Sequence, residues 1–387
     1  MTPQDFRRRF PSLERTVHLA SCSLGARSTD LDGALDRMLD DMAEGGAPWG
    51  RFTEQVELAR HRFAALVGAR PDQVSVQPNA SVAAYQVAST ADYRMRHAYG
   101  TRDTVLTSSA EFPSIGHVWR GQRRRGARIL SGDAGQDLSA LMDRRTRFVS
   151  VPLTGYQDAE RQPVAELSEA AHAAGAEIFV DAYQAAGVEP IDVGALDCDH
   201  LVAGTGKYLL GLPGLAFLYS RSPALTDRDP RLTGWFGRVD PFAFDPERLD
   251  FPETATRFET GTPAVAACYT AAATLDLIGR LDLAAVREHV LDLADLAAAV
   301  LADQGEQVRL LPRARRGAHL GLLDPDPAGL AAGLAARGVA TSPRGDVVRL
   351  AFHYYSNADD VAALAAALQD VRRSTRRASG PVTPLAG

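Results

Sequence analysis

The stretch Asp199-His200-Leu201-Val202-Ala203-Gly204-Thr205-Gly206-Lys207-Tyr208 contains the one lysine of a 387-residue protein. Lysine and arginine together number 42, so arginine supplies every other permanently positive side chain. Arginine stays protonated in proteins, whereas a desolvated lysine can lose its proton and form a Schiff base with a carbonyl compound. We therefore expect Lys207 to serve covalent chemistry; the alternative is a residual lysine in an arginine-biased sequence.

The surroundings of Lys207 predict a loop between two buried strands. Apolar residues precede it at 201–203, and a second apolar run follows at 215–219. Upstream, the apolar run 176–180 ends in Asp181. An acid at the carboxyl end of a buried strand lies where open α/β sheets bind their ligands, and loops between strands commonly display functional groups. These positions predict a ligand site at the strand ends.

Strands alternate with helices along most of the sequence, which indicates a mainly parallel sheet covered by helices. The strands are predicted at 73–77, 103–107, 128–130, 147–151 and 176–181. Helices are predicted at 28–45, 53–67, 163–174 and 264–278, with another that ends at Ala91. From about residue 282 the pattern reads helix, strand, helix, strand, helix. The tail from about 374 is rich in Pro, Gly and Ser, and we expect it to be disordered.

Composition excludes several classes of protein. Hydrophobic residues make up 45% and charged residues 23%, as in ordinary globular proteins. The formal net charge of −6 argues against a nucleic-acid partner, and no apolar run is long enough to span a membrane, so a cytoplasmic protein is expected. Cys22, Cys198 and Cys268 show neither metal-ligand spacing nor a disulfide framework, so no metal is expected.

Several segments together resemble the aminotransferase class V family of pyridoxal 5'-phosphate (PLP) enzymes, which includes cysteine desulfurases, kynureninases and isopenicillin N epimerase-like proteins. The segments are Val180–Gly187, Asp199 with Lys207, Glu111–Ser114, Arg257–Pro263 and Val347–Asp360. Matching stretches run from about residue 18 to residue 360. The resemblance implies an α/β fold, PLP fold type I. This fold has a large domain with a mainly parallel seven-stranded sheet between helices, and a smaller α+β C-terminal domain.

The resemblance also implies a division of the protein into domains. Residues 1–27 would join the small domain, residues 28–263 would form the large PLP-binding domain, residues 264–373 would form the small domain, and residues 374–387 would be the tail. In the family, the threonine that corresponds to Thr262 reaches the phosphate of the partner subunit. A homodimer with shared active sites is therefore expected.

The resemblance assigns roles around the ring of PLP. Lys207 would hold the cofactor as a Schiff base and then act as a general base at the substrate Cα. Asp181 would pair with the pyridinium nitrogen and strengthen the electron sink. Phe112 would stack on the ring, although core packing is its alternative reading. Gln184 would hydrogen-bond the ring oxygen.

Other residues are expected at the phosphate and at the substrate. Small polar residues at a helix start offer free N–H groups to an anion, which suggests the backbone of Ala80 and Ser81, or else a plain helix cap. By resemblance, Thr205 and Trp235 are further cofactor contacts. Arg349 would clamp the substrate carboxylate, because its guanidinium fits a carboxylate with two parallel hydrogen bonds; its alternative is a surface-strand arginine.

These residues predict an enzyme that acts on an amino acid or amino-acid conjugate. We favour a lyase that cleaves a C–S or C–C bond in the substrate's side chain, because the segments around Phe112 and Arg349 look more like kynureninases and epimerases than dedicated transaminases. A class V aminotransferase, decarboxylase or epimerase is the alternative, and a regulatory protein of the same fold is the non-enzyme alternative. Persulfide relay is disfavoured because residues 338–344 contain no cysteine. Structural roles are expected for Cys22 and His353; the alternatives are that Cys22 lines the active site and that His353 is catalytic.

Overall fold

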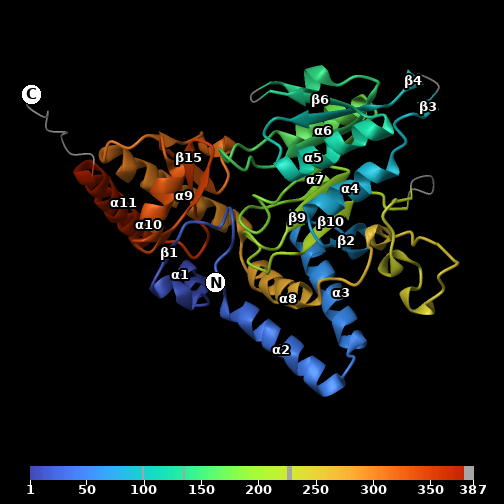
Figure 1. Cartoon of the computed structure of the whole chain (residues 1–387), viewed down its shortest axis with the longest axis horizontal. Coiled ribbons are helices and arrows are strands. Elements are labelled where there is room, and N and C mark those ends of the chain that lie inside the picture. Colours follow the sequence, from blue (N-terminus) through green and yellow to red (C-terminus); the bar gives the residue numbers. More distant parts are fainter. Residues whose placement is uncertain (98–99, 134–135, 225–228, 379–387) are drawn as a thin grey trace, which may run out of the picture.

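The computed structural model describes residues 1–97, 100–133, 136–224 and 229–378, and these are organised around two sheets (Figure 1). The larger sheet has seven strands. In spatial order they are β2 (Val74–Gln77), β10 (Ala216–Ser220), β9 (His200–Gly204), β8 (Glu177–Asp181), β7 (Thr146–Pro152), β5 (Thr104–Ser108) and β6 (Arg128–Gly132). Six of the seven strands run in the same direction, and β10 runs in the opposite direction, between β2 and β9. The predicted mainly parallel seven-stranded sheet is confirmed.

Helices cover both faces of this sheet, so most of its strands are buried along their whole length. Every residue of β2, β5, β7, β9 and β10 is buried. The α-helices described in this part of the protein are α2 (Thr29–Gly45), α3 (Trp49–Leu66), α4 (Ala80–Thr90), α5 (Pro113–Gly121), α6 (Val164–Ala173), α7 (Val193–Leu196) and α8 (Val265–Gly279). Two short strands, β3 (Arg96–His97) and β4 (Gly100–Thr101), pair with each other in antiparallel orientation. Helix α3 begins at Trp49, four residues before its predicted start at 53.

The smaller sheet is antiparallel, with the order β11 (Val308–Arg309), β12 (His319–Leu323), β15 (Val347–Ala351), β14 (Ser342–Arg344). It packs with α9 (Leu283–Asp303), α10 (Pro327–Ala335) and α11 (Ala358–Ala378) in the left half of Figure 1. The predicted order helix, strand, helix, strand, helix corresponds to α9, β12, α10, β15 and α11. The prediction from sequence missed β11, β13 (Val339–Ala340) and β14. Strands of two or three residues are too short to show an alternation of apolar and polar residues.

The N-terminal segment, with α1 (Pro3–Arg7) and β1 (Val17–His18), packs beside the smaller sheet. β1 pairs with β13 in parallel, which places Val17 opposite Val339. At the other end, α11 continues to Ala378, so the expectation of disorder from about 374 is wrong for residues 374–378. Alanine and arginine favour helix, and α11 ends in them. The remainder of the predicted tail, residues 379–387, lies outside the described residues.

Among the described residues, no helix is both long and apolar enough to cross a bilayer.

Candidate active site

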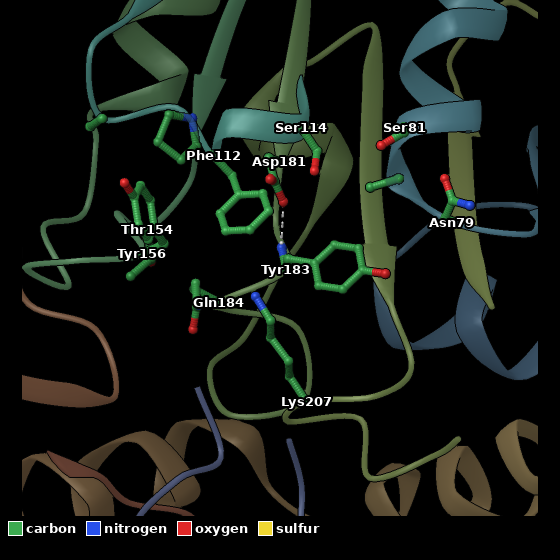
Figure 2. Close-up of a pocket in the computed structure, with 13 residues that line it drawn as sticks. Asn79, Ser81, Phe112, Ser114, Thr154, Tyr156, Asp181, Tyr183, Gln184 and Lys207 are labelled. Carbon is green, nitrogen blue, oxygen red and sulfur yellow. Dashed lines mark hydrogen bonds between the residues drawn. The ribbon is translucent and has the colours of Figure 1, made fainter. Parts of the chain in front are cut away.

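A cavity of about 190 Å³ opens at the carboxyl ends of β7, β8 and β9, beside the first turn of α4 (Figure 2). Six of the residues predicted from the sequence line it: Ala80, Ser81, Phe112, Asp181, Gln184 and Lys207. They come from segments that are up to 127 residues apart in the sequence, and the order of strands in the sheet brings them together.

Lys207 lies in the loop between β9 and β10, as predicted, at a turn within that loop. The turn is closed by a hydrogen bond from the Leu210 N–H to the Lys207 carbonyl, 3.1 Å long, and the Gly25 N–H donates to the Gly206 carbonyl at 3.0 Å. A Cβ atom on Gly25 would lie 2.4 Å from the Lys207 carbonyl oxygen. Glycine at position 25 therefore allows the N-terminal segment to press against the backbone that carries the lysine.

The Lys207 amine sits in an aromatic and largely desolvated environment. Its Nζ atom lies 5.4 Å from the centre of the Phe112 ring and 4.9 Å from that of Tyr183. Burial lowers the pKa of the Lys207 amine, and the Asp181 carboxylate opposes this shift in part. A lowered pKa makes the neutral, nucleophilic amine more available near neutral pH.

Asp181 ends β8 and is 5% exposed, with Oδ1 accepting a 2.9 Å hydrogen bond from the Tyr183 N–H. A second carboxyl group, that of Glu111, is also buried, and its Oε2 accepts a 2.7 Å hydrogen bond from the Ser150 hydroxyl. Burial, and then the nearby Asp181 carboxylate, raise the pKa of Glu111 to about 8. Burial beside Asp181 therefore favours the neutral form of Glu111 near pH 7. The sequence showed Glu111 beside Phe112 but gave it no role.

The two sides of the cavity offer different polar groups (Figure 2). On one side, Asn79 caps α4 with its side-chain oxygen, which accepts from the Val82 N–H at 3.0 Å. The amides of Ala80 and Ser81, the first two of the helix, have no partner within it, and an anion can take their place. On the other side, Gln184 donates from Nε2 to the Cys22 carbonyl at 3.1 Å, while its buried Oε1 has no hydrogen-bond partner among the described residues.

Three predicted cofactor contacts do not line this cavity. The Thr205 hydroxyl is fully buried and faces the carbonyls of Leu212 and Leu215. Trp235 belongs to an aromatic cluster with Trp49 and other rings, and Thr262 is exposed at a separate small cavity. The roles of Thr205, Trp235 and Thr262 at the cofactor stay predictions, and that of Thr262 involves a second subunit.

Arg349 on β15 lies behind the cavity wall and is 1% exposed. Its Nη1 donates to the Tyr156 carbonyl at 2.6 Å and its Nη2 to the Ser342 hydroxyl at 2.8 Å. Tyr156 itself lines the cavity, so the residue that accepts this hydrogen bond also borders the cavity. The structure places Arg349 next to the site but with its donors turned to protein oxygens.

Asn79, Ser114, Thr154, Tyr156 and Tyr183 also line the cavity, and sequence reasoning gave them no role. Thr154 and Tyr156 belong to the loop after β7, where no local pattern marks a binding residue. For Tyr183, the signal was its position two residues after Asp181.

His353 is fully buried. Its Nε2 hydrogen-bonds the Tyr208 carbonyl at 3.0 Å, and its Nδ1 accepts from the Tyr354 N–H at 2.7 Å. Both ring nitrogens are thus engaged with backbone groups. This supports the structural role expected from the sequence.

The residues present fit PLP on structural grounds. The cavity combines an amine, a carboxylate, an aromatic ring and free N–H groups at a helix start, and it includes the orphaned acceptor Gln184 Oε1. These groups match an aldehyde, a pyridine nitrogen, a flat ring and a phosphate respectively, and the Gln184 oxygen is left for a hydroxyl donor. Lys207, Asp181, Phe112, Gln184 and Ser81 would hold the cofactor.

Comparisons with known proteins agree with this site. The family model "Aminotransferase class-V" matches residues 44–364. An uncharacterized aminotransferase, YcbU of Bacillus subtilis, is 33% identical over 363 residues, which are 93% of this protein and 95% of that one. Kynureninase of Pseudomonas fluorescens is 27% identical over 86% of this sequence and 83% of its own length.

Solved structures share the fold at low sequence identity. The cysteine desulfurase CsdA of Escherichia coli superposes with a TM-score of 0.85 at 22% identity, over 97% of this protein and 99% of that one. The cystine C–S lyase C-DES does so with a TM-score of 0.83 at 20% identity, over 93% and 99% of the two proteins. With the family model matching most of its length, the chain belongs to the aminotransferase class V family of PLP-dependent enzymes.

Proposed function

We propose that this enzyme acts on an amino acid or amino-acid conjugate, cleaves a C–S or C–C bond in its side chain, and binds its α-carboxylate through Arg349. The proposal that the substrate is an amino acid rests on Arg349. Its guanidinium is buried beside the site and forms no ion pair with a carboxylate of the described residues. Each of the other four buried arginines pairs with an acid: Arg60 with Glu259, Arg147 with Glu177, Arg257 with Asp229 and Arg316 with Asp295. Arg349 forms no ion pair among the described residues.

An unpaired buried charge is costly, and the cost falls when an anion arrives. A substrate carboxylate can take the place of the Tyr156 carbonyl at Nη1, because a carboxylate accepts two parallel hydrogen bonds from one guanidinium. After burial, the Arg349 charge is one of the influences that lower the pKa of the Lys207 amine, which is a sign that the two positive groups lie close together. A carboxylate at Arg349 would therefore place the substrate amine near Lys207.

Arg349→Gln tests the carboxylate site. We expect KM for the amino acid to rise about 10- to 100-fold, the usual range for losing a charge-assisted hydrogen bond. Steady-state kinetics give the KM, and the matched control is an amine of the same side chain without the carboxylate, whose weak binding should not change. The melting temperature is measured alongside, because the change also removes the hydrogen bonds to the Tyr156 carbonyl and the Ser342 hydroxyl. An unchanged KM would assign Arg349 to the fold alone.

In this proposal the protein's own groups divide the work. PLP, when bound, supplies the electron sink for charge that develops at the substrate Cα. Asp181 holds the proton on the pyridine nitrogen, and Lys207 removes and returns the proton at Cα. Phe112 orients the ring by stacking on it, and Ser81 with the α4 amides binds the phosphate.

The lyase assignment rests on the Phe112 segment and on the lining of the cavity. Cys22, Cys198 and Cys268 are all buried and none lines the cavity, so the persulfide relay of a cysteine desulfurase has no cysteine there. A transaminase remains the second candidate, favoured by the aminotransferase name of the relative from Bacillus subtilis.

Turnover without a keto acid separates the two reactions. A lyase needs one substrate and regenerates its starting cofactor form, so we expect continued release of a side-chain fragment with the visible absorption unchanged. Product analysis with a panel of amino acids and cysteine conjugates, with and without a keto acid, gives the answer. Activity that stops after a single turnover per site, and resumes when keto acid is added, would make the enzyme a transaminase.

We further propose that two copies of the protein associate through the segment 232–249 (yellow in Figure 1). Large apolar side chains are exposed there, including Phe244 at 72% and Leu249 at 62%, and a patch of this kind marks an interaction surface. Thr262 is exposed as well, as its predicted contact with a partner subunit requires.

Light scattering tests this association. The wild-type protein should have twice the monomer mass of 41.4 kDa, and Phe244→Glu should lower the measured mass to that of the monomer. A monomeric wild-type protein would contradict the proposal.

A further inference from the structure

We propose that Tyr183 forms a second aromatic face of the cofactor site, in addition to Phe112, and that the two rings retain PLP even without its covalent bond to Lys207. The proposal concerns how this protein holds its cofactor, so it does not depend on which reaction the enzyme catalyses.

The first support is the placement of the two rings around the lysine amine. Tyr183 and Phe112 both line the cavity, and both lie within 5.4 Å of Lys207 Nζ, measured to the ring centres (Figure 2). Phe112 packs edge-on against Tyr156, with ring centres 5.2 Å apart, and among the described residues there is no ring contact between Phe112 and Tyr183. A flat group that reaches the lysine amine therefore meets two separate aromatic surfaces.

The second support is that the Tyr183 side chain has a fixed position. The backbone N–H of Tyr183 donates a hydrogen bond to Asp181 Oδ1. This bond fixes the Tyr183 backbone relative to the carboxylate expected at the pyridine nitrogen. Its phenol lies against the backbone of β9 at Gly204, where an added Cβ would be 1.6 Å from the hydroxyl oxygen. Only glycine at position 204 leaves room for this ring, so the Tyr183 ring lines the cavity and is supported from behind by the β9 backbone.

The third support is the electrostatic state of the phenol. Burial, and to a lesser degree the Asp181 carboxylate, raise the pKa of Tyr183 above its usual value, so the ring stays neutral throughout the physiological range. A neutral aromatic ring stacks on a flat heterocycle without adding negative charge beside Asp181.

The experiment measures cofactor affinity in a Lys207→Ala background, where binding is entirely non-covalent. PLP is titrated against the purified protein by calorimetry or by quenching of protein fluorescence. Removing an aromatic platform from a flat heterocycle typically costs enough to weaken binding about 10-fold or more, so Tyr183→Ala should raise the Kd for PLP by that factor. Tyr183→Phe keeps the ring and is the matched control; its Kd should stay within about 2-fold of the parent.

Gly204→Ala is a second variant that should displace the Tyr183 ring. The three atoms nearest to the added Cβ all belong to Tyr183, so this change should displace the phenol and weaken PLP binding much as Tyr183→Ala does. In a protein that already carries Tyr183→Ala, the Gly204→Ala change should have little further effect. Such non-additivity is the signature of two residues that act through one contact.

Three results would overturn the proposal. A Tyr183→Ala variant with unchanged Kd would mean that the ring does not touch the cofactor. An equal loss in Tyr183→Phe would assign the effect to the hydroxyl, and a Lys207→Ala parent that binds no PLP would show that the rings hold nothing on their own. None of these results would alter the product analysis that tests the lyase proposal.

Discussion

Lys207→Ala is expected to abolish turnover and to remove the PLP adduct that borohydride fixes to the wild-type protein. The reason is that no other side chain supplies an amine, because Lys207 is the one lysine in the sequence. Lys207→Arg should do no better, since a guanidinium stays protonated and cannot form the Schiff base. Mass spectrometry of borohydride-reduced, digested protein measures the adduct and its position.

Because the sequence contains a single lysine, the position of the adduct is easy to assign. In the wild-type protein, Lys207 is the one side-chain amine of this sequence to which borohydride can fix PLP, so the peptide that carries the adduct identifies the attachment site. Turnover that persists in the alanine variant, or an adduct found only on a peptide without Lys207 in the wild-type protein, would show that Lys207 is not the attachment site.

The buried strands and the residues directly attached to them could be predicted from sequence. A strand buried on both faces is a continuous apolar run, so the ends of β8 and β9 were visible, and with them the placement of Asp181 and Lys207. The first turn of α4 was visible for a similar reason, because small polar residues follow an apolar strand. The match of these groups to one cofactor came from the resemblance to a family, not from their periodicity.

Residues that reach the site across the fold could not be predicted. Arg349 donates a hydrogen bond to the carbonyl of Tyr156, which lies 193 positions away in the sequence. Gln184 likewise donates to the carbonyl of Cys22, 162 positions away. Local pattern carries no information about such pairs. The raised pKa of Glu111 likewise depends on burial beside Asp181, which only the folded protein creates.

Asp181→Asn is expected to leave PLP bound but to lower turnover by orders of magnitude. Asparagine keeps the size and the hydrogen bond from the Tyr183 N–H but has no negative charge to hold a proton on the pyridine nitrogen. Lys207, Phe112 and the α4 amides would still bind the cofactor. The measurements are the cofactor content after dialysis and kcat under saturating substrate.

Glu111→Gln is the matched control for this loss of charge, because it changes the second buried carboxyl group, which lies near Asp181 but does not line the cavity. The pKa of Glu111 is raised to about 8, so the wild-type side chain is already neutral below that pH, and its amide should support nearly normal kcat there. Above about pH 8 the wild-type Glu111 ionises beside Asp181, and only there should the two proteins diverge. If Asp181→Asn retained near-normal turnover, Asp181 would be a structural acid at the end of a strand. If Glu111→Gln lost as much activity as Asp181→Asn at pH 7, the negative charge at the site would belong to both carboxyl groups and not to Asp181 alone.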